Sequence, residues 1–417
     1  MQTNINNSQN KNEPYDLPSG WKWVRLGELF SFQQGVAMSP QRRRGIIPYP
    51  FLRTLNVLWG KLDLSAIDKM DFTDDEVEKL SLKIGDLLVC EGGKVGRTAV
   101  WNGYMDICLH QNHIHRLRRI TDNVIPEFYM YWMQAAFKVF KLYGGQASET
   151  TIPNLSIGRL RSFLVPFPPL EIQRHIAAKL QELMNDIESA RNACEKQLEA
   201  AKALPSAYLR EVFESPEAKK WEKMHLGDVC KIFSGSPAPQ NKRYFQNGEH
   251  PFVRVQDLAK YKRTTELVET NDCINDDAIK ELQLVKAKKG TILFPKSGAA
   301  IRTNNRAILG LDAFIVSHLA AISPRPEFAD TYFVYYWLCL ADMVHLMENP
   351  GYPSLKLSTV SKTSIPLPPV STQRRVASQL KEKMNYIDRL ESLIQDQQSA
   401  LGVLYETILK KAFRGEL

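Results

Sequence analysis

The chain of 417 residues is long enough for several domains, and its 44% hydrophobic and 24% charged residues are typical of a soluble globular protein. No apolar run reaches the roughly 18 residues of a membrane span, and the six cysteines lie far apart without a CxxC pair, which argues against a membrane protein, a disulfide scaffold or a zinc site. We therefore expect a cytoplasmic protein with reduced thiols. The net charge of +8 is compatible with a polyanionic partner, because phosphates reward clustered Lys and Arg by counterion release.

The first part of the chain predicts a short tail and a globular domain. Residues 1–16 are rich in Asn and Gln and have no signal-peptide core, which predicts a disordered, solvated tail. Over residues 17–166, short apolar runs such as 86–90 alternate with Gly, Pro and Asn turns, so a mostly β domain is expected. Aromatic and aliphatic residues recur every three or four positions over 127–142, which predicts a helix within this domain.

A proline-rich segment, 165–169, should end this domain, since consecutive prolines cannot continue a helix or an inner strand. Apolar residues then follow a 4-3 spacing from Ile176 to Leu204, with Gln197 as a polar interruption. A stripe of this length predicts a coiled-coil helix. We assign residues 167–214 to a central helical region.

The chain then repeats itself. With an offset of 200, the matching pairs include Trp21 and Trp221, Leu26 and Leu226, Gly35 and Gly235, and Gln173 and Gln373. Inside the globular part the offset grows to 205, which pairs Gly93 with Gly298, Arg97 with Arg302, Thr98 with Thr303, and His113 with His318. A period this long indicates duplication of a whole module, with length changes confined to loops.

The second copy predicts the same elements: a globular domain over 215–366 with a helix over 330–347, and a C-terminal helical region over 367–417. Its apolar stripe runs from Val376 through Leu404 to Ile408, interrupted at Lys383 and Gln397. The obvious partner for each long helix is the other one, and packing on its own globular domain is the alternative. The residues expected in helix-helix packing are Leu180, Leu183, Ile187, Leu380, Ile387, Leu390 and Ile394.

An antiparallel pair of these helices would give an α+β fold: two mostly-β domains separated by a coiled coil, with approximate twofold symmetry within one chain. DNA repeats its groove about every 34 Å, so two domains on such a rod could meet successive grooves of one duplex.

Several strings resemble the specificity subunits of type I restriction-modification systems. They are the Trp-x4-Leu-Gly opening of each module, the Pro-Pro-x3-Gln-Arg segments that end at Arg174 and Arg374, and the terminal Lys-Ala-Phe-Arg-Gly-Glu-Leu of residues 411–417. The resemblance covers residues 17–417. It implies two target-recognition domains that each read one half of a bipartite DNA site, and two helical regions that space these domains and dock two methyltransferase subunits.

The same resemblance implies a subunit that is not itself an enzyme. It directs adenine methylation, or restriction when restriction/translocase subunits join, in the nucleoid of a prokaryote. S-adenosylmethionine, ATP and Mg are expected on the partner subunits. The alternatives are a nonspecific basic DNA-binding scaffold and a coiled-coil interaction protein without sequence readout.

Basic residues in loops of the two globular domains are the candidates for DNA contact, since Arg binds guanine bidentately and Lys neutralises phosphate. They are Arg42, Arg43, Arg44, Arg53, Lys94 and Arg97 in the first domain and Lys242, Arg243, Arg254, Lys296, Arg302 and Arg306 in the second. Arg53 and Arg254 lie in matching apolar contexts, which favours a structural role for both. Gln33, Gln34, Gln240, Asn241, Asn304 and Asn305 are candidates for adenine edges.

Three motifs suggest chemistry and are incomplete. Residues 349–352 resemble the Asn-Pro-Pro-Tyr motif of adenine methyltransferases, but no glycine-rich turn for a methyl donor accompanies them. Residues 91–98 resemble a phosphate-binding loop without its GxxxxGK[ST] pattern. Of His110, His113 and His115 only His113 has a counterpart in the second copy, and no Cys or acid is expected to supply the remaining ligands, so a metal site is not expected.

Overall fold

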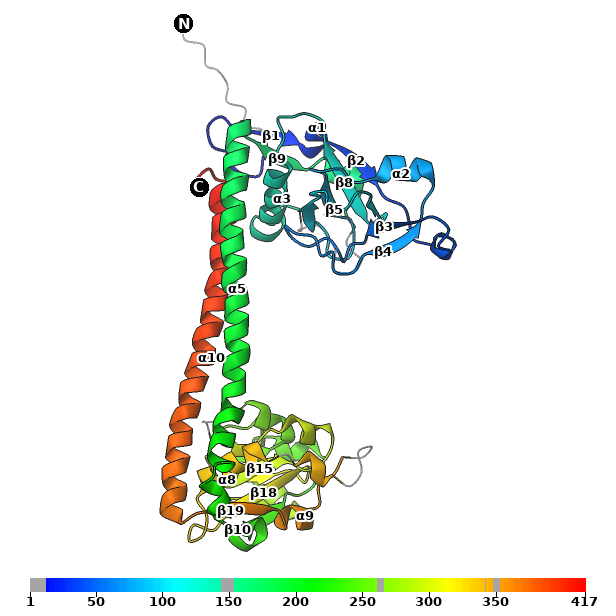
Figure 1. Ribbon diagram of the computed structural model, residues 1–417. Coiled ribbons are helices and arrows are strands. Elements are labelled where there is room, and N and C mark those ends of the chain that lie inside the picture. The colour runs from blue at the N-terminus through cyan, green and yellow to red at the C-terminus, as the bar shows by residue number, and fades with distance from the viewer. Residues whose placement is uncertain (1–12, 144–153, 261–265, 342, 348–352) are drawn as a thin grey trace. The chain divides into compact units, whose positions relative to one another are not determined.

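The computed structural model describes residues 13–143, 154–260, 266–341, 343–347 and 353–417 (Figure 1). The chain divides into two compact units: unit 1 comprises residues 1–193 and 397–417, and unit 2 comprises residues 194–396. Each unit therefore contains one globular domain and one half of each long helix. Most of the predicted tail and of the segments 145–153 and 348–352 lies outside the described residues.

The described strands of unit 1 form three sheets, in the orders β1-β9, β2-β8-β5-β6 and β4-β3-β7. The strands are β1 (Lys22–Arg25), β2 (Phe30–Gln34), β3 (Pro48–Leu52), β4 (Asp68–Asp71), β5 (Leu87–Cys90), β6 (Thr98–Val100), β7 (Leu109–His110), β8 (Ile114–Arg119) and β9 (Leu164–Phe167). The helices are α1 (Leu26–Leu29), α2 (Asp74–Leu80), α3 (Pro126–Gln134), α4 (Ile157–Arg161), the 3₁₀ helix η1 (Pro40–Arg43) and the π-helical η2 (Ala135–Val139).

Strand β5 lies between two cores, which explains its uninterrupted apolar run. Successive side chains of a strand point to opposite faces. Leu87 and Val89 accordingly pack in the core around α3, and Leu88 and Cys90 pack in a second core with Trp101. A strand buried on both faces gains nothing from a polar residue on either face. Its sequence is therefore a continuous apolar run and not an alternation of apolar and polar residues.

Unit 2 repeats this topology in the sheets β10-β19, β11-β18-β15-β16 and β13-β12-β17-β14, with β14 as an additional edge strand of the third sheet. Its strands are β10 (Glu222–His225), β11 (Cys230–Ser234), β12 (His250–Val253), β13 (Asp272–Ile274), β14 (Lys286–Ala287), β15 (Ile292–Pro295), β16 (Ala307–Ile308), β17 (Ala313–Ile315), β18 (Leu319–Pro324) and β19 (Ser364–Leu367). Its helices are α6 (Leu226–Val229), α7 (Asp276–Leu282), α8 (Thr331–Leu340), α9 (Leu357–Ser361), and the 3₁₀ helices η3 (Ala218–Lys220), η4 (Lys242–Phe245), η5 (Val255–Lys260), η6 (Ala299–Thr303) and η7 (Val344–Leu346).

The duplication inferred from sequence therefore extends to the fold, with one correction in its alignment. Leu87 pairs with Val100 and Ile292 pairs with Ile308, so the second strand of this hairpin is offset by 208 residues, not 205. The equivalence of Arg97 and Thr98 with Arg302 and Thr303 is consequently wrong. The loop of unit 2 is three residues longer, and a residue-by-residue match could not locate the insertion because Arg-Thr recurs by coincidence.

The proline-rich segments, predicted to end each globular domain, contribute its last strand, β9 or β19, and the consecutive prolines follow that strand. Pro166 of β9 pairs with Trp23 of β1, and Pro366 of β19 pairs with Lys223 of β10. Both sheets are two-stranded, so every strand in them is an edge strand, where the missing N–H of proline is tolerated.

A buried glutamine explains why Gln follows each proline-rich segment. The Gln173 side chain accepts a hydrogen bond from the Ile125 amide (3.0 Å) and donates to the carbonyls of Asn123 (3.1 Å) and Pro168 (2.9 Å). Gln173 thereby joins the start of α3 to the start of the long helix α5 (Leu170–Phe213).

The glutamine of the second copy does the same in unit 2. Gln373 accepts from the Asp330 amide (2.9 Å) and donates to the carbonyls of Phe328 (3.0 Å) and Pro368 (2.8 Å). It joins the start of α8 to that of the other long helix, α10 (Val370–Ala412). We call each of these arrangements a glutamine clamp.

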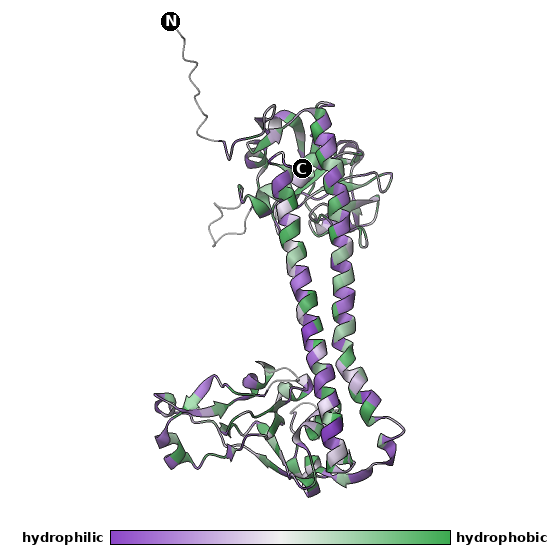
Figure 2. Ribbon diagram, turned by 90° about the vertical axis from the view of Figure 1, so that its left-hand side faces the viewer, coloured by the Kyte–Doolittle hydropathy of each residue, from purple (hydrophilic) through white to green (hydrophobic). Residues whose placement is uncertain are grey.

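In unit 1, the first half of α5 lies beside the last half of α10 with opposite chain direction (Figures 1 and 2). Ile187 of α5 shares a core with Ile408 of α10, and the Arg191 guanidinium lies 5.3 Å from the Tyr405 ring centroid. The early turns of α5 also pack on α3, through Ile176. The helix therefore packs both on its own globular domain and on α10.

Unit 2 contains the other half of each long helix, and these two halves also pack together. Lys383 of α10 lies 3.4 Å from the Glu211 carboxylate of α5 and 4.2 Å from the Tyr208 ring centroid. Leu209 of α5 shares a core with Leu380 of α10. Figure 2 shows hydrophilic residues along both helices, as expected where only a narrow stripe is buried.

The predicted packing residues lie on the inward side of the helices. Those fully buried are Leu180, Ile187, Leu380, Ile387 and Ile394, and those partly buried are Leu183 and Leu390. Leu404 departs from the predicted stripe, because it is 46% exposed and the neighbouring Tyr405 is turned inward. A straight helix has 3.6 residues per turn, so a 3.5-residue pattern drifts off the buried face over several turns.

Two predicted boundaries also shift. The helix expected over 330–347 ends at Leu340, and only a 3₁₀ turn follows within the described part of that range. Tyr15, assigned to the tail, packs on Trp23 and donates a hydrogen bond to the Phe413 carbonyl (3.0 Å). No helix of the described chain is both long and apolar enough to cross a membrane.

Candidate nucleic-acid interface

The β5–β6 hairpin of unit 1 ends in an open glycine-rich loop. Gly93 and Gly96 have φ angles of +73° and +82°, in a region of backbone conformation that residues with a Cβ rarely adopt. A Cβ on Gly96 would lie 2.6 Å from the Phe137 ring, whereas one on Gly93 would meet nothing within 4 Å. Lys94 is exposed at this tip. The loop therefore offers bare backbone and one cation to an approaching polyanion.

Glu91, at the base of this loop, is the centre of a polar cluster. Its carboxylate lies 3.4 Å from His113 Nδ1, 3.9 Å from His115 Nε2 and 3.4 Å from Gln34 Nε2. Main-chain bonds hold it in place: its amide donates to the His113 carbonyl, and its own carbonyl accepts from the Leu155 amide, both at 2.9 Å. The Glu91 and His115 side chains are 10% and 0% exposed, whereas that of His113 is 50% exposed.

Unit 2 has the same main chain at this position and different side chains. Lys296 replaces Glu91: its amide donates to the His318 carbonyl (2.9 Å), and its carbonyl accepts from the Leu355 amide (2.8 Å). His318 Nδ1 lies 2.5 Å from Ser297 Oγ instead of beside an acid. Ala320 takes the place of the buried His115. We call residues 91 and 296, each with the histidine that both units share (His113 or His318), the 91/296 locus.

Most candidate arginines of unit 1 are engaged in ion pairs. Arg42 forms two bonds with Glu76, at 2.8 and 2.7 Å, and these chiefly hold the pKa of the Glu76 carboxyl below its usual value. Arg43 and Arg53 lie 2.8 and 3.4 Å from the Asp68 carboxylate. Pairing with an acid withdraws an arginine from phosphate or base contacts, so these three are weakened as candidates.

Two arginines of unit 2 are engaged similarly. Arg243 lies 2.5 Å from the Glu281 carboxylate and 4.7 Å from the Tyr244 ring centroid. Arg254 pairs with Asp272, the counterpart of the Arg53–Asp68 pair on the equivalent strands. The duplicated pair favours the structural role that the sequence suggested for Arg53 and Arg254.

Arg306 is buried, with its guanidinium 4.8 Å from the Phe294 ring centroid. The hairpin register gives it the place of Thr98 in unit 1, next to the first paired residue of β16. Its sequence context, an Asn-rich loop, predicted exposure because the three-residue insertion was not visible.

Of the other candidates, Arg44, Lys94, Lys242 and Arg302 are exposed, and Arg97 and Lys296 are partly buried. The four exposed cations have no acid partner among the residues that the structure describes. They lie on loops or 3₁₀ turns of both units, which leaves them available to phosphate.

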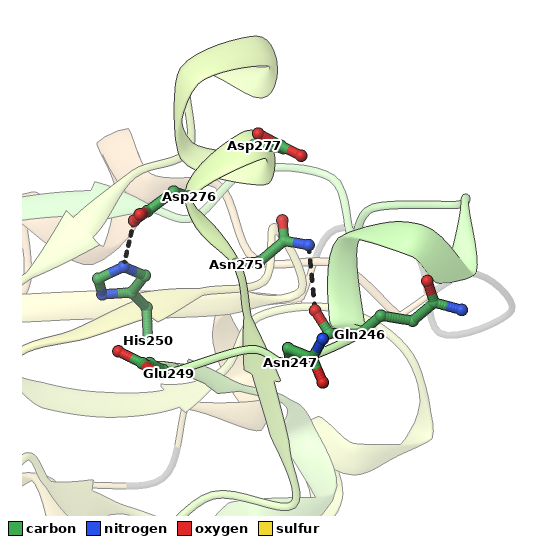
Figure 3. A pocket seen from close by; sticks show the side chains of 7 residues that line it. All are labelled: Gln246, Asn247, Glu249, His250, Asn275, Asp276 and Asp277. Carbon is green, nitrogen blue, oxygen red and sulfur yellow. Dashed lines mark hydrogen bonds and ion pairs between the residues drawn. The ribbon is translucent and has the colours of Figure 1, made fainter.

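One pocket of unit 2 is acidic and unsuited to a phosphate backbone. Figure 3 shows His250 directed toward Asp276, and the Nε2–Oδ1 distance is 2.8 Å. This hydrogen bond lowers the pKa of the Asp276 carboxyl. Glu249 and Asp277 also line the pocket. The equivalent segment of unit 1 is apolar and includes Ile46, which is 73% exposed, so the two units differ here as well.

The histidines do not assemble a metal site among the described residues, where no group of three or more His, Cys, Asp or Glu side chains is placed to hold an ion. An acid does lie beside two of them, because the fold brings Glu91 next to His113, which is 22 residues further along the chain, and near His115. His110 is fully buried, and burial lowers its pKa to about 3.

Comparison with known proteins identifies the repeated architecture. The family described as "Type I restriction modification DNA specificity domain" matches residues 18–199 and again residues 218–397. The chain belongs to this family. Its two family domains coincide with the two copies that the internal repeat and the strand orders establish, and they make the chain a DNA sequence-specificity subunit.

Curated members of the family match over most of their length. The specificity subunit of the type I restriction enzyme MjaIX from Methanocaldococcus jannaschii is 27% identical over 83% of this chain and 82% of its own. The EcoKI specificity subunit from Escherichia coli K12 is 20% identical over 96% of this chain and 90% of its own.

Solved structures share the fold. A chain from a type I restriction-modification system, solved in a study of its assembly and conformational transition, aligns with a TM-score of 0.76 at 22% identity, over 97% of this chain and 100% of that one. The HsdS subunit from Thermoanaerobacter tengcongensis aligns with a TM-score of 0.63 at 22% identity, over 97% and 99%.

Proposed function

We propose that each globular domain reads one half of a bipartite, asymmetric DNA site and that this chain directs partner subunits to it. One observation carries the proposal: two domains with one main-chain framework have different side chains at equivalent positions, above all at the 91/296 locus. Identical domains would read identical half-sites, and unrelated domains would not share one main-chain framework. The basic loops supply the sequence-independent part of the affinity.

Two methyltransferase subunits are the proposed partners, and restriction or translocase subunits would join the same assembly. Tyr386 and Leu393, seven residues apart on α10 in unit 2, are 65% and 62% exposed. Exposed apolar residues in one heptad phase favour a protein partner on that face of the helix. At the repeat-equivalent positions α5 has Asp186 and Ala193, so the two helices would contribute unequally.

In this proposal the chain itself performs no chemistry. S-adenosylmethionine would bind the methyltransferase subunits, ATP and Mg the restriction subunits, and the assembly would act on DNA in the prokaryotic nucleoid. The lengths of α5 and α10 would set the number of base pairs between the half-sites, so deleting one heptad from both helices should change that spacer.

Selection from random DNA tests the proposal. The chain is assembled with its methyltransferase partner, and bound fragments are recovered in the presence of excess competitor DNA. We expect one split sequence with a fixed spacer to be enriched. Equal recovery of all sequences, with steep salt dependence, would indicate a nonspecific basic scaffold instead. No recovery of DNA by the intact assembly would indicate a coiled-coil interaction protein.

A further inference from the structure

At the 91/296 locus the two units carry opposite charges on an unchanged main chain. Both residues follow the equivalent strands β5 and β15, and both accept and donate the same pair of main-chain hydrogen bonds. A carboxylate in unit 1 therefore occupies the position of an ammonium group in unit 2. The framework does not require either charge, because it holds both.

The neighbouring side chains change together with the charge. In unit 1, Gln34 donates to the Glu91 carboxylate (3.4 Å) and to the Asn112 carbonyl (3.0 Å). In unit 2, Ser234 stands at the position of Gln34 and donates to the Ser317 carbonyl (3.0 Å). The donor to the carboxylate is thus absent where the carboxylate is absent.

The loop that follows the locus is open in both units, whereas the Glu91 side chain itself is only 10% exposed and Lys296 is partly exposed. Gly93 and Gly298 each have open space where a Cβ would be, and exposed cations follow at Lys94 and Arg302. His113 is half exposed beside Glu91. A DNA backbone held by these cations would bring base edges toward the histidine and the variable residue, and a charge held rigidly at a base edge discriminates strongly.

We propose that the 91/296 locus determines one base in each half-site, an inference that rests on the proposed function. Glu91 accepts a hydrogen bond from the exocyclic amino group of a cytosine, which a carboxylate reads in the major groove. Lys296 donates to the O6 and N7 acceptors of a guanine. The domain of unit 1 consequently selects a cytosine and that of unit 2 a guanine on the strand that faces this locus.

The test uses the complete assembly with its methyltransferase partner and two DNA libraries, each randomised in one half-site. For Glu91→Gln we expect the preference for cytosine at one position of half-site 1 to fall by about five- to 150-fold, with half-site 2 unchanged. Lys296→Gln should reduce the preference for guanine at one position of half-site 2 and leave half-site 1 unchanged. The matched controls are Glu78→Gln and Lys280→Gln, on exposed faces of α2 and α7, which should alter neither half-site.

Unchanged base preferences in both locus variants would overturn the inference, as would a uniform loss of affinity for all sequences. Thermal unfolding of each assembly establishes that the variants are folded. If Glu91→Gln lowers the unfolding midpoint, Lys296→Gln decides the matter in the other unit. Failure of the proposed function is distinguishable, because the wild-type assembly would then select no split sequence at all.

Discussion

The two units of this chain share a framework and differ in what the framework presents. The glutamine clamp, the strand order of the β2 and β11 sheets and the arginine–aspartate pair between adjacent strands recur in both. The side chains at the 91/296 locus, the length of the following loop and the pocket around His250 do not. Features that hold the chain together have been kept after duplication, and features at the loop ends have diverged. This is the pattern expected if the two copies need the same fold and different binding partners.

Loss of the glutamine clamp has the largest expected effect on stability. If the two units did not depend on the clamp equally, the comparison between them would fail. Gln173→Leu leaves the Ile125 amide and two carbonyls without their partner, which should lower the free energy of unfolding of unit 1 by about 3 kcal/mol. Gln373→Leu should do the same in unit 2. Denaturant unfolding measures both, with the exposed Gln197→Leu as the control. A loss in only one unit would contradict a shared clamp.

Acid sensitivity should separate the units, because His110 occupies the place of Ile315. Burial lowers the pKa of His110 to about 3, below its unfolded value, so the unfolded chain takes up the proton first as pH falls. The stability of unit 1 is complete above about pH 6.5 and declines below it, by about 1.4 kcal/mol per pH unit. Unit 2 lacks this group.

The measurement is hydrogen exchange of core amides in each unit at pH 7 and pH 5, corrected for the intrinsic exchange rate. We expect β7 amides to lose protection at pH 5 relative to β17 amides, and His110→Leu to remove the difference. Equal acid dependence of the two strands in the wild-type protein would refute the assignment.

Exposed cations of the two units should act alike on DNA whatever base each unit reads. Lys94→Ala and Arg302→Ala should each weaken binding of the assembly by about 1 kcal/mol for all sequences and reduce the salt slope by about 1. Titration of labelled DNA at several salt concentrations measures both quantities. A change in sequence preference would mean that these cations read bases, which would shift the specificity away from the 91/296 locus.

The smallest effect concerns the paired arginines. Arg53→Met and Arg254→Met should lower stability by less than about 1 kcal/mol, since both pairs are about one-third exposed. Neither should change DNA affinity beyond the few tenths expected from net charge. A large loss of affinity in either variant, with normal unfolding, would show that the pairs open to bind DNA.

Much of this architecture could be predicted from the sequence because duplication doubles every signal. The matching tryptophans, glutamines and proline-rich segments give the modular order, and the narrow apolar stripes give the long helices. The strands of the proline-rich segments could not be foreseen, because Pro166 is compatible with a strand only at a sheet edge, and edges are a property of the tertiary fold.

The candidate site was harder to predict, since exposure and pairing depend on residues far apart in sequence. Arg42 belongs with Glu76 and Arg254 with Asp272, and no local pattern reveals either pair. Glu91 was visible only as part of an incomplete phosphate-binding motif. Its significance comes from its main-chain hydrogen bonds, which make it the structural counterpart of Lys296 in the other copy.

The most direct test of the central claim is a genome-wide map of methylated adenine in cells with and without this gene, with the methyltransferase partner expressed in both. Loss of one split motif with a fixed spacer, while all other motifs persist, is the result predicted for a chain that reads one half-site with each domain. An unchanged map would contradict it, and loss of a continuous motif would contradict the assignment of two half-sites to two domains.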